Sequence, residues 1–223
     1  MKAYLSLWSA DLLALGEAID HVDSSVDGYH VDVMDGVCVP HLLFGPDFVA
    51  AFRKRTVKPL DVHVMLADSN DWIDRLVEAG GDMLTVHRQF CHDVSTALGR
   101  IRSRGARAGL ALELRDPISA ETLPLELVDR LLVMGTEIGI KGCDLHPETP
   151  ARVQQILQIC CQTGCRPEII VDGGIRRTTV PRLVRAGADG VVPGSLVFGE
   201  SDPCAALRWI RAQPTGATTE EAA

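Results

Sequence analysis

Apolar residues along the chain occur in short continuous runs that alternate with longer amphipathic stretches. The runs, such as 169–171, are continuous, which is typical of strands buried on both faces of a parallel sheet. A glycine often stands between an amphipathic stretch and the next run, as Gly105 and Gly187 do. Glycine supplies the left-handed cap that ends many helices, so these joins predict turns from helix to strand.

Strand and helix patterns alternate eight times. We expect strands near 3–7, 29–34, 60–65, 82–87, 107–112, 129–134, 168–172 and 189–193. We expect helices near 10–21, 46–54, 69–79, 93–104, 119–123, 149–163, 178–186 and 203–212, with the weakest pattern at 119–123. Eight such units predict a single-domain α/β fold, a (β/α)8 TIM barrel, over residues 1–211.

An open doubly wound sheet is the alternative fold. The first strand-to-helix junction, however, lacks the Gly-x-Gly-x-x-Gly loop with which many such sheets bind phosphate. Residues 212–223 show no apolar period, so we expect a flexible C-terminal tail there.

Length and charge narrow the possible partners. The 223 residues suit one barrel, and 22 Lys and Arg against 30 Asp and Glu give a net charge of −8. Without a basic cluster, an acidic chain is a poor partner for nucleic acid or an anionic membrane. There is no apolar run of about 18 residues and no signal peptide pattern. The seven cysteines form no Cys-x-x-Cys pair, which disfavours a cysteine zinc site and indicates a reducing, cytoplasmic compartment.

Polar side chains mark the ends of several predicted strands, where catalytic residues of TIM barrels are found. The two-residue period places His30 and Asp32 on one face of their strand and His63 on the matching face of the next strand, while Asp172 ends the seventh. One such residue alone would be read as a core histidine or a helix cap. Two imidazoles and two carboxylates together suit Zn²⁺, Fe²⁺, Mn²⁺ or Co²⁺ better than Ca²⁺ or Mg²⁺.

Two further groups lie at the same end of the predicted barrel. Met34, Met65 and Met134 are either core filler or an apolar ceiling over a metal and its substrate. Loops after the last three strands contain exposed backbone that suits a phosphate, because glycine leaves N–H groups uncovered. These loop residues are Gly139, Ile140, Lys141, Gly142, Gly173, Gly174, Gly194 and Ser195. Each glycine pair alone would be ordinary turn chemistry, but three adjacent loops predict an anion site.

Five motifs in order resemble those of the ribulose-phosphate 3-epimerase family. They are Ser-Leu-Trp-Ser-Ala-Asp at 6–11, His-Val-Asp-Val-Met-Asp-Gly at 30–36, Asp-Val-His-Val-Met at 61–65, Val-Asp-Gly-Gly at 171–174 and Pro-Gly-Ser at 193–195. The resemblance extends over about residues 3–200, and the second motif is specific. It implies a TIM-barrel isomerase that interconverts D-ribulose 5-phosphate and D-xylulose 5-phosphate in the pentose phosphate pathway.

The resemblance also implies roles for individual residues. One divalent ion, zinc first, would be held by His30, Asp32, His63 and Asp172. Asp32 and Asp172 would be the acid/base pair, Ser6 and His63 would contact the substrate, and the glycine loops would bind its phosphate. Inversion of a carbon next to a ketone needs a base on each face and electrophilic help, which agrees with this set. The family also implies a homo-oligomer.

The chain departs from the family pattern around the cavity mouth. The sixth loop reads Glu137-Ile138-Gly139-Ile140-Lys141-Gly142 instead of Asn-Pro-Gly-Phe-Gly-Gly, and Glu113-Leu114 replaces Asn-Pro after the fifth strand. Lys141 adds a cation suited to phosphate, and Glu137 is a candidate partner for it.

These departures leave the identity of the sugar open, so a 3-epimerase of another ketose phosphate, such as D-allulose 6-phosphate, is the alternative. A lyase of the related phosphate-binding barrels would carry Asp-x-Lys-x-x-Asp where this chain has 61–66 without a lysine. Asp32 and Asp172 argue against a non-catalytic sugar-phosphate sensor.

Overall fold

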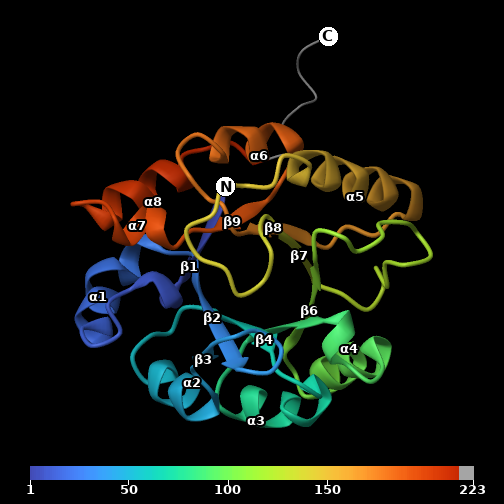
Figure 1. The fold of residues 1–223 in the computed structure, drawn as a ribbon, viewed down its shortest axis with the longest axis horizontal. Helices are drawn as coiled ribbons and strands as arrows, with labels where there is room; N and C mark the ends of the chain where they lie inside the picture. The colour runs from blue at the N-terminus through green and yellow to red at the C-terminus, as the bar shows by residue number, and fades with distance from the viewer. Residues whose placement is uncertain (216–223) are drawn as a thin grey trace.

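The computed structural model describes residues 1–215, and its centre is a ring of parallel strands surrounded by helices (Figure 1). The ring strands are β1 (Lys2–Ser6), β2 (Gly28–Asp35), β4 (Leu60–Met65), β5 (Met83–His87), β6 (Arg107–Leu112), β7 (Arg130–Met134), β8 (Glu168–Asp172) and β9 (Gly190–Val192). Pairing of β1 with both β9 and β2 closes the ring. The predicted single-domain TIM barrel is confirmed.

The helices lie outside the ring (Figure 1). They are α1 (Leu15–Val22), α2 (Pro46–Arg53), α3 (Ile73–Glu78), α4 (Val94–Ser103), α5 (Thr149–Thr163), α6 (Val180–Ala186), α7 (Ser195–Phe198) and α8 (Pro203–Arg211). Local sequence sets several of their ends. The side chains of Asp93 and Asp202 accept backbone N–H groups at the starts of α4 and α8, and Gly164 and Gly187 end α5 and α6 in the left-handed conformation.

The register between β2 and β4 positions the polar residues of the ring interior. His30 pairs with Asp61 and Asp32 pairs with His63 along the two strands. The intervening valines, such as Val31 and Val62, are fully buried in the apolar layer that includes residues of the helices. Burying each such side chain contributes about 1.5–3 kcal/mol, so the apolar face holds the polar face in register.

A charged cluster fills the amino-terminal end of the ring. The Arg130 guanidinium donates to Asp61 at 2.6 Å and to Glu168 at 2.6 and 3.0 Å, and it lies 4.0 Å from the centre of the Tyr4 ring. Lys2 donates to the other Glu168 oxygen at 2.7 Å. Arg130 is only 1% exposed, so two carboxylates are needed to compensate its buried charge.

The predicted helix at 119–123 is wrong, because these residues form turns. Pro124 disfavours helical backbone at the residue before it, and the Ser119 hydroxyl and carbonyl accept the Thr122 N–H in a local turn.

Three other elements differ from the sequence-based expectation. The first helix begins at Leu15, after a 3₁₀ turn at Leu7–Ser9, and α7 and the short antiparallel strand β3 (Leu42–Leu43) were not predicted. Most of the predicted tail, residues 216–223, lies outside the described residues. Of the described part, Gln213 accepts a hydrogen bond from the Met1 amine at 2.6 Å. Within residues 1–215, no helix is long and apolar enough to cross a membrane.

Glu168→Gln tests the contribution of the charged cluster. Burial raises the pKa of Glu168, but Arg130 and Lys2 outweigh burial and lower it below its ordinary value. A lowered pKa stabilises the fold above the ordinary value of about 4.5, and this stabilisation is lost as the pH falls through the folded value. We expect the variant to lose about 2 kcal/mol of unfolding free energy near neutral pH. When stability is measured by urea unfolding, the difference in unfolding free energy between Glu168→Gln and wild type should become smaller below about pH 4.5.

Asp20→Asn is the control, because Asp20 pairs with Arg55 at 2.6 Å but is 59% exposed. An exposed pair contributes at most about 1 kcal/mol. Equal losses in the two variants would show that burial of the Arg130 cluster does not matter to stability.

Candidate active site

A cavity of about 290 Å³ opens at the carboxyl ends of the ring strands. All predicted substrate-binding residues line it. These are Ser6, Met34, His63, Met65, Met134, Gly139, Ile140, Lys141, Gly142, Gly173, Gly174, Gly194 and Ser195. Asp32 and Asp172 also line the cavity, whereas His30 lies behind them and is fully buried.

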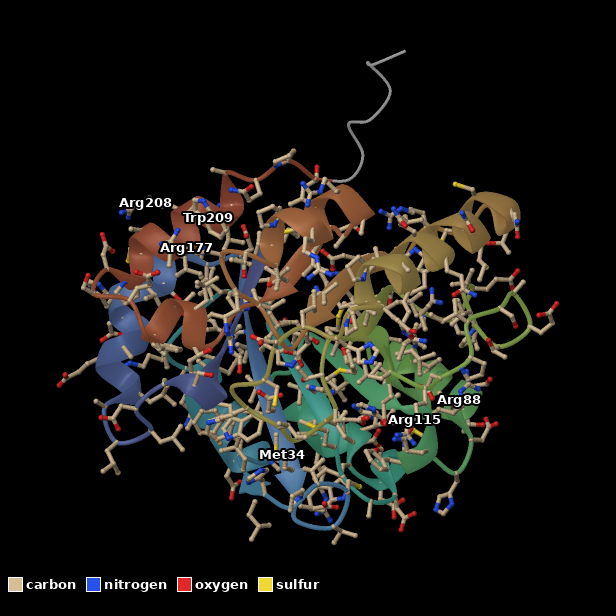
Figure 2. All side chains as sticks on the ribbon, turned by 45° about the horizontal axis from the view of Figure 1, so that its top comes forward. Met34, Arg88, Arg115, Arg177, Arg208 and Trp209 are labelled. Atoms are coloured by element: carbon tan, nitrogen blue, oxygen red, sulfur yellow. The ribbon has the colours of Figure 1, made fainter. Side chains whose placement is uncertain are left out.

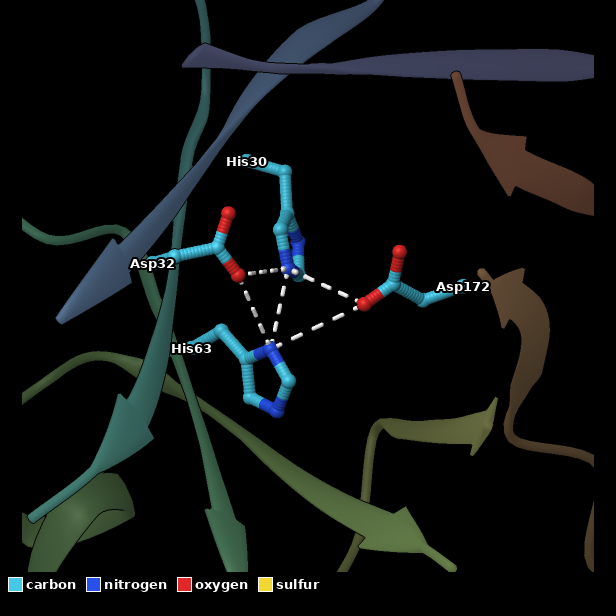
Figure 3. A group of neighbouring side chains, drawn as sticks. All are labelled: His30, Asp32, His63 and Asp172. Atoms are coloured by element: carbon cyan, nitrogen blue, oxygen red, sulfur yellow. Dashed lines mark hydrogen bonds and ion pairs between the residues drawn. The ribbon is translucent and has the colours of Figure 1, made fainter. Parts of the chain in front are cut away.

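Four side chains from three strands meet at the floor of this cavity (Figure 3). One ligand atom from each of His30, Asp32, His63 and Asp172 lies within 4.8 Å of the others. His30 Nε2 is 3.1 Å from His63 Nδ1, and Asp32 Oδ1 is 3.4 and 3.3 Å from these two nitrogens. Asp172 Oδ2 lies 3.8 Å from both nitrogens. The structure thus brings together the four residues singled out as candidate ligands.

The second ring nitrogen of each histidine has its own buried partner. His30 Nδ1 is 2.9 Å from Asp61 Oδ2, the oxygen that also accepts from Arg130. His63 Nε2 is 2.7 Å from His87 Nε2, and His87 Nδ1 is 2.8 Å from Glu113 Oε1. These outer contacts fix the orientation of both rings toward the cluster.

The charges of the cluster are strongly coupled. Burial alone would raise the pKa of Asp32, but His30 and His63 lower it below its ordinary value. Burial raises the pKa of Asp172 to about 7, with His30 opposing the rise and Asp32 and Asp61 reinforcing it. Burial would lower the pKa of His30, yet Asp32 and Asp61 raise it well above its ordinary value. The site therefore favours a positive charge between the carboxylates.

The donor set fits a divalent cation. If His30 donates from Nδ1 to Asp61, its neutral ring presents the bare Nε2 to the cluster. Two imidazole nitrogens and two carboxylate oxygens suit a first-row transition ion or zinc. Such an ion would replace the proton that otherwise supplies the positive charge at His30.

The opposite wall of the cavity is built from the loops after β7, β8 and β9. Gly174 has a φ of +68°, and a Cβ there would collide with the backbone of Leu145, so the close approach of two loops requires glycine. Arg176 Nη1 donates to the Ser195 hydroxyl at 3.1 Å. Lys141 Nζ donates to the Trp8 carbonyl and lies 4.3 Å from the centre of its ring.

Within residues 1–215, no ion pair joins Lys141 to Glu137, its candidate partner, and the Lys141 ammonium donates to the Trp8 carbonyl. Lys141 instead closes over Trp8, which lines the same cavity. Burial lowers the pKa of Lys141, and the charge of Asp32 in the same cavity opposes this shift, so the ammonium at the cavity wall is within electrostatic reach of that carboxylate.

Sequence reasoning missed several residues of the site. His87 is the last residue of β5, two residues beyond Thr85, which pairs with His63. A histidine at a strand end was a signal for it, but its contact with Glu113, the residue after β6, forms only in the folded ring. Arg176 follows the Gly173-Gly174 turn, and only the folded loops reveal its contact with Ser195. Arg130 begins a strand, where a basic residue is ordinarily exposed.

Fold and site together define a TIM barrel with a candidate metal centre and a glycine-rich cavity wall that includes Lys141 and Arg176. The ribulose-phosphate 3-epimerase family matches residues 2–198, and the chain belongs to this family. It is therefore a carbohydrate epimerase, which is an isomerase.

Individual relatives and one solved structure resemble the chain as follows. It is 35% identical to the chloroplastic ribulose-5-phosphate-3-epimerase of Arabidopsis thaliana, over 93% of this chain and 75% of that protein. The ribulose-phosphate 3-epimerases of Synechocystis and Bacillus subtilis are 36% and 33% identical, over 92% and 95% of this chain and 91% and 98% of theirs. A 3-hexulose-6-phosphate synthase superposes with a TM-score of 0.66 over 96% of this chain and 99% of its own. At 20% identity, that likeness shows the fold alone.

Direct titration tests the metal centre. We expect the metal-free protein to bind one equivalent of Zn²⁺, and Asp172→Asn to weaken binding at least tenfold because it removes an anionic ligand. Isothermal titration calorimetry measures both affinities. Asp71→Asn, at an exposed position in the 3₁₀ turn Ser69–Asp71, should bind as wild type does. Equal affinity in all three proteins would remove Asp172 from the ligand set.

Proposed function

We propose that this chain interconverts D-ribulose 5-phosphate and D-xylulose 5-phosphate by moving a proton at carbon 3. The observation that carries this proposal is the placement of Asp32 and Asp172, which approach the histidine pair from opposite sides (Figure 3). Family membership supports the reaction class, because the relatives named above are ribulose-phosphate 3-epimerases. Inversion at one carbon requires a proton-transfer group on each face of that carbon.

The pKa shifts of the two carboxyl groups support a base role for Asp32 and an acid role for Asp172. The lowered pKa of Asp32 keeps it ionised, so it can take the proton from carbon 3 of one epimer. The C–H electron pair then forms the C2–C3 double bond of a planar enediolate, and the ketone oxygen gains the charge. Without a metal, burial raises the pKa of Asp172 to about 7, so it is the carboxyl of the pair that carries a proton more readily, and it is placed to return one to carbon 3 from the other face. The two groups exchange roles for the reverse reaction.

A divalent ion held by His30, Asp32, His63 and Asp172 would stabilise the negative charge of the enediolate; zinc is our first candidate, with iron, manganese and cobalt as alternatives. Ser6 supports the base, because its hydroxyl donates to Asp32 Oδ2 at 3.1 Å.

The methionines give the reacting carbon an apolar cover. Met34, Met65 and Met134 are 2–4% exposed and line the cavity beside the carboxylates. An apolar cover limits access of water, and exclusion of water strengthens the electrostatic interactions of a charged intermediate.

The substrate phosphate fits the opposite wall. The loops at 139–142, 173–174 and 194–195 line the cavity, where their backbone N–H groups and the Ser195 hydroxyl would donate to a phosphate. Arg176 and Lys141 add two cations beside these groups. A guanidinium and an ammonium offset the repulsion that a chain of net charge −8 exerts on a phosphate dianion.

The cellular setting is also an inference. All seven cysteines are free, which supports a reducing, cytoplasmic location. The homo-oligomer expected from the family stays a prediction.

Exchange with solvent tests the proposed reaction. Metal-loaded protein incubated with D-ribulose 5-phosphate in D₂O should yield D-xylulose 5-phosphate with deuterium at carbon 3, observed by NMR. Asp172→Asn should lower the rate by about 10³-fold, since it cannot carry the transferred proton. Asp71→Asn should keep wild-type turnover. Exchange with D-allulose 6-phosphate alone would change the substrate assigned, and no exchange with either sugar would contradict the proposal.

Arg176→Met tests the phosphate wall. Losing a charge-assisted hydrogen bond to phosphate should raise KM about tenfold and leave kcat nearly unchanged, because the phosphate does not react. Lys141→Met should act in the same direction. Arg177→Met is the matched control: Figure 2 shows Arg177 beside Trp209 and away from Met34, and it pairs with Glu200 at 3.0 Å. Steady-state kinetics that leave KM unchanged in Arg176→Met would remove this residue from substrate binding.

A further inference from the structure

His87 and Glu113 form a second layer behind one of the candidate metal ligands. We propose that Glu113, acting through His87, is a positioning residue that fixes His63 as an Nδ1 ligand and strengthens its bond to the metal. The inference rests on the divalent-metal site of the proposed function. Neither His87 nor Glu113 lines the cavity, so an effect on the metal has to pass through His63.

The contacts form one continuous line away from the cluster. In Figure 3, one nitrogen of His63 faces the other three side chains, and the second faces away from them. That second nitrogen, Nε2, lies 2.7 Å from His87 Nε2, and His87 Nδ1 lies 2.8 Å from Glu113 Oε1. The centroids of the His63 and His87 rings are 4.9 Å apart, and the planes of the two rings form an angle of 18°. His63 is 1% exposed and His87 is fully buried, so the contact between the two rings is shielded from water, and the Glu113 side chain beyond them is 18% exposed.

The number of protons available fixes the direction of hydrogen-bond donation from His63 through His87 to Glu113. An ionised carboxylate only accepts, so His87 has to donate to Glu113 from Nδ1. A neutral imidazole carries one proton, which leaves His87 Nε2 as an acceptor. His63 therefore donates from Nε2, and its Nδ1 lone pair points into the cluster. The carboxylate at one end thus determines which nitrogen is free to bind a metal at the other.

The other histidine has a different support. His30 is backed by Asp61, whose charge is compensated by Arg130 at 2.6 Å. Among residues 1–215, the only ion pair of Glu113 is with His87, and its other side-chain contact is the neutral amide of Gln89. The negative charge of Glu113 consequently polarises the two imidazoles toward the metal, which makes His63 the stronger donor of the pair.

Removing the charge of Glu113 without changing its shape tests this. A carboxylate behind a ligating histidine commonly contributes 10- to 100-fold to metal affinity. We expect Glu113→Gln to weaken Co²⁺ binding by about tenfold in a titration followed by the visible absorption of the ion. KM for the sugar phosphate should stay unchanged, since the cavity wall is untouched.

Asp68→Asn is the matched control. Asp68 also pairs with a histidine, His92, at 3.2 Å, but both side chains are exposed and lie outside the cavity lining. Asp68 has a φ of 52°, which asparagine tolerates. This variant should bind Co²⁺ as tightly as wild type. Thermal unfolding of the metal-free proteins separates a loss of affinity from a loss of stability.

Imidazole ¹⁵N NMR of the Zn²⁺-loaded wild type reads the proton positions directly. We expect a proton on His87 Nδ1 and on His63 Nε2. A proton on His87 Nε2 would overturn the inference, as would a Glu113→Gln variant that binds Co²⁺ like wild type. If wild type binds neither Co²⁺ nor Zn²⁺, the metal site of the proposed function fails and this inference fails with it. If wild type binds and only the Glu113 effect is missing, the proposed function stands without the second layer.

Discussion

The parallel register of β2 against β4 is the constraint on which the site depends. Because His30 lies opposite Asp61 and Asp32 lies opposite His63, one pair of strands supplies three candidate ligands and the support of one of them. A shift of one residue would exchange these side chains for the valines of the outer face. The apolar layer between ring and helices therefore holds the chemistry in place, and β8 needs to add only Asp172.

Compensation of buried charge extends this constraint through the ring. Asp61 lies between His30 and Arg130, and Arg130 lies between Asp61 and Glu168, so alternating charges run from the cluster to the amino-terminal end of the barrel. Each member would be costly to bury alone. His63 has a separate line through His87 to Glu113. The two histidines are thus oriented by two different polar chains that do not share a residue beyond the cluster.

Much of the fold and of the cluster could be predicted from the sequence, because both follow from periodicity. Continuous apolar strands between glycine-capped helices specify a parallel ring, and the two-residue period brings His30, Asp32 and His63 to one face. Contacts between separate loops or strands could not be predicted in the same way. Arg176 meets Ser195, and His87 meets Glu113, only after the ring has closed. The weak pattern at 119–123 failed because Pro124 and the Ser119 turn override helix propensity locally.

The buried Arg130 cluster also affects how a sugar phosphate enters and leaves the cavity. Within residues 1–215, Arg130 and Tyr4 fill the ring interior below His30, and the cavity opens at the carboxyl ends of the strands. A sugar phosphate that enters there has to leave through the same opening after its carbon is inverted. The two epimers then compete for one entrance, and an excess of either slows conversion of the other.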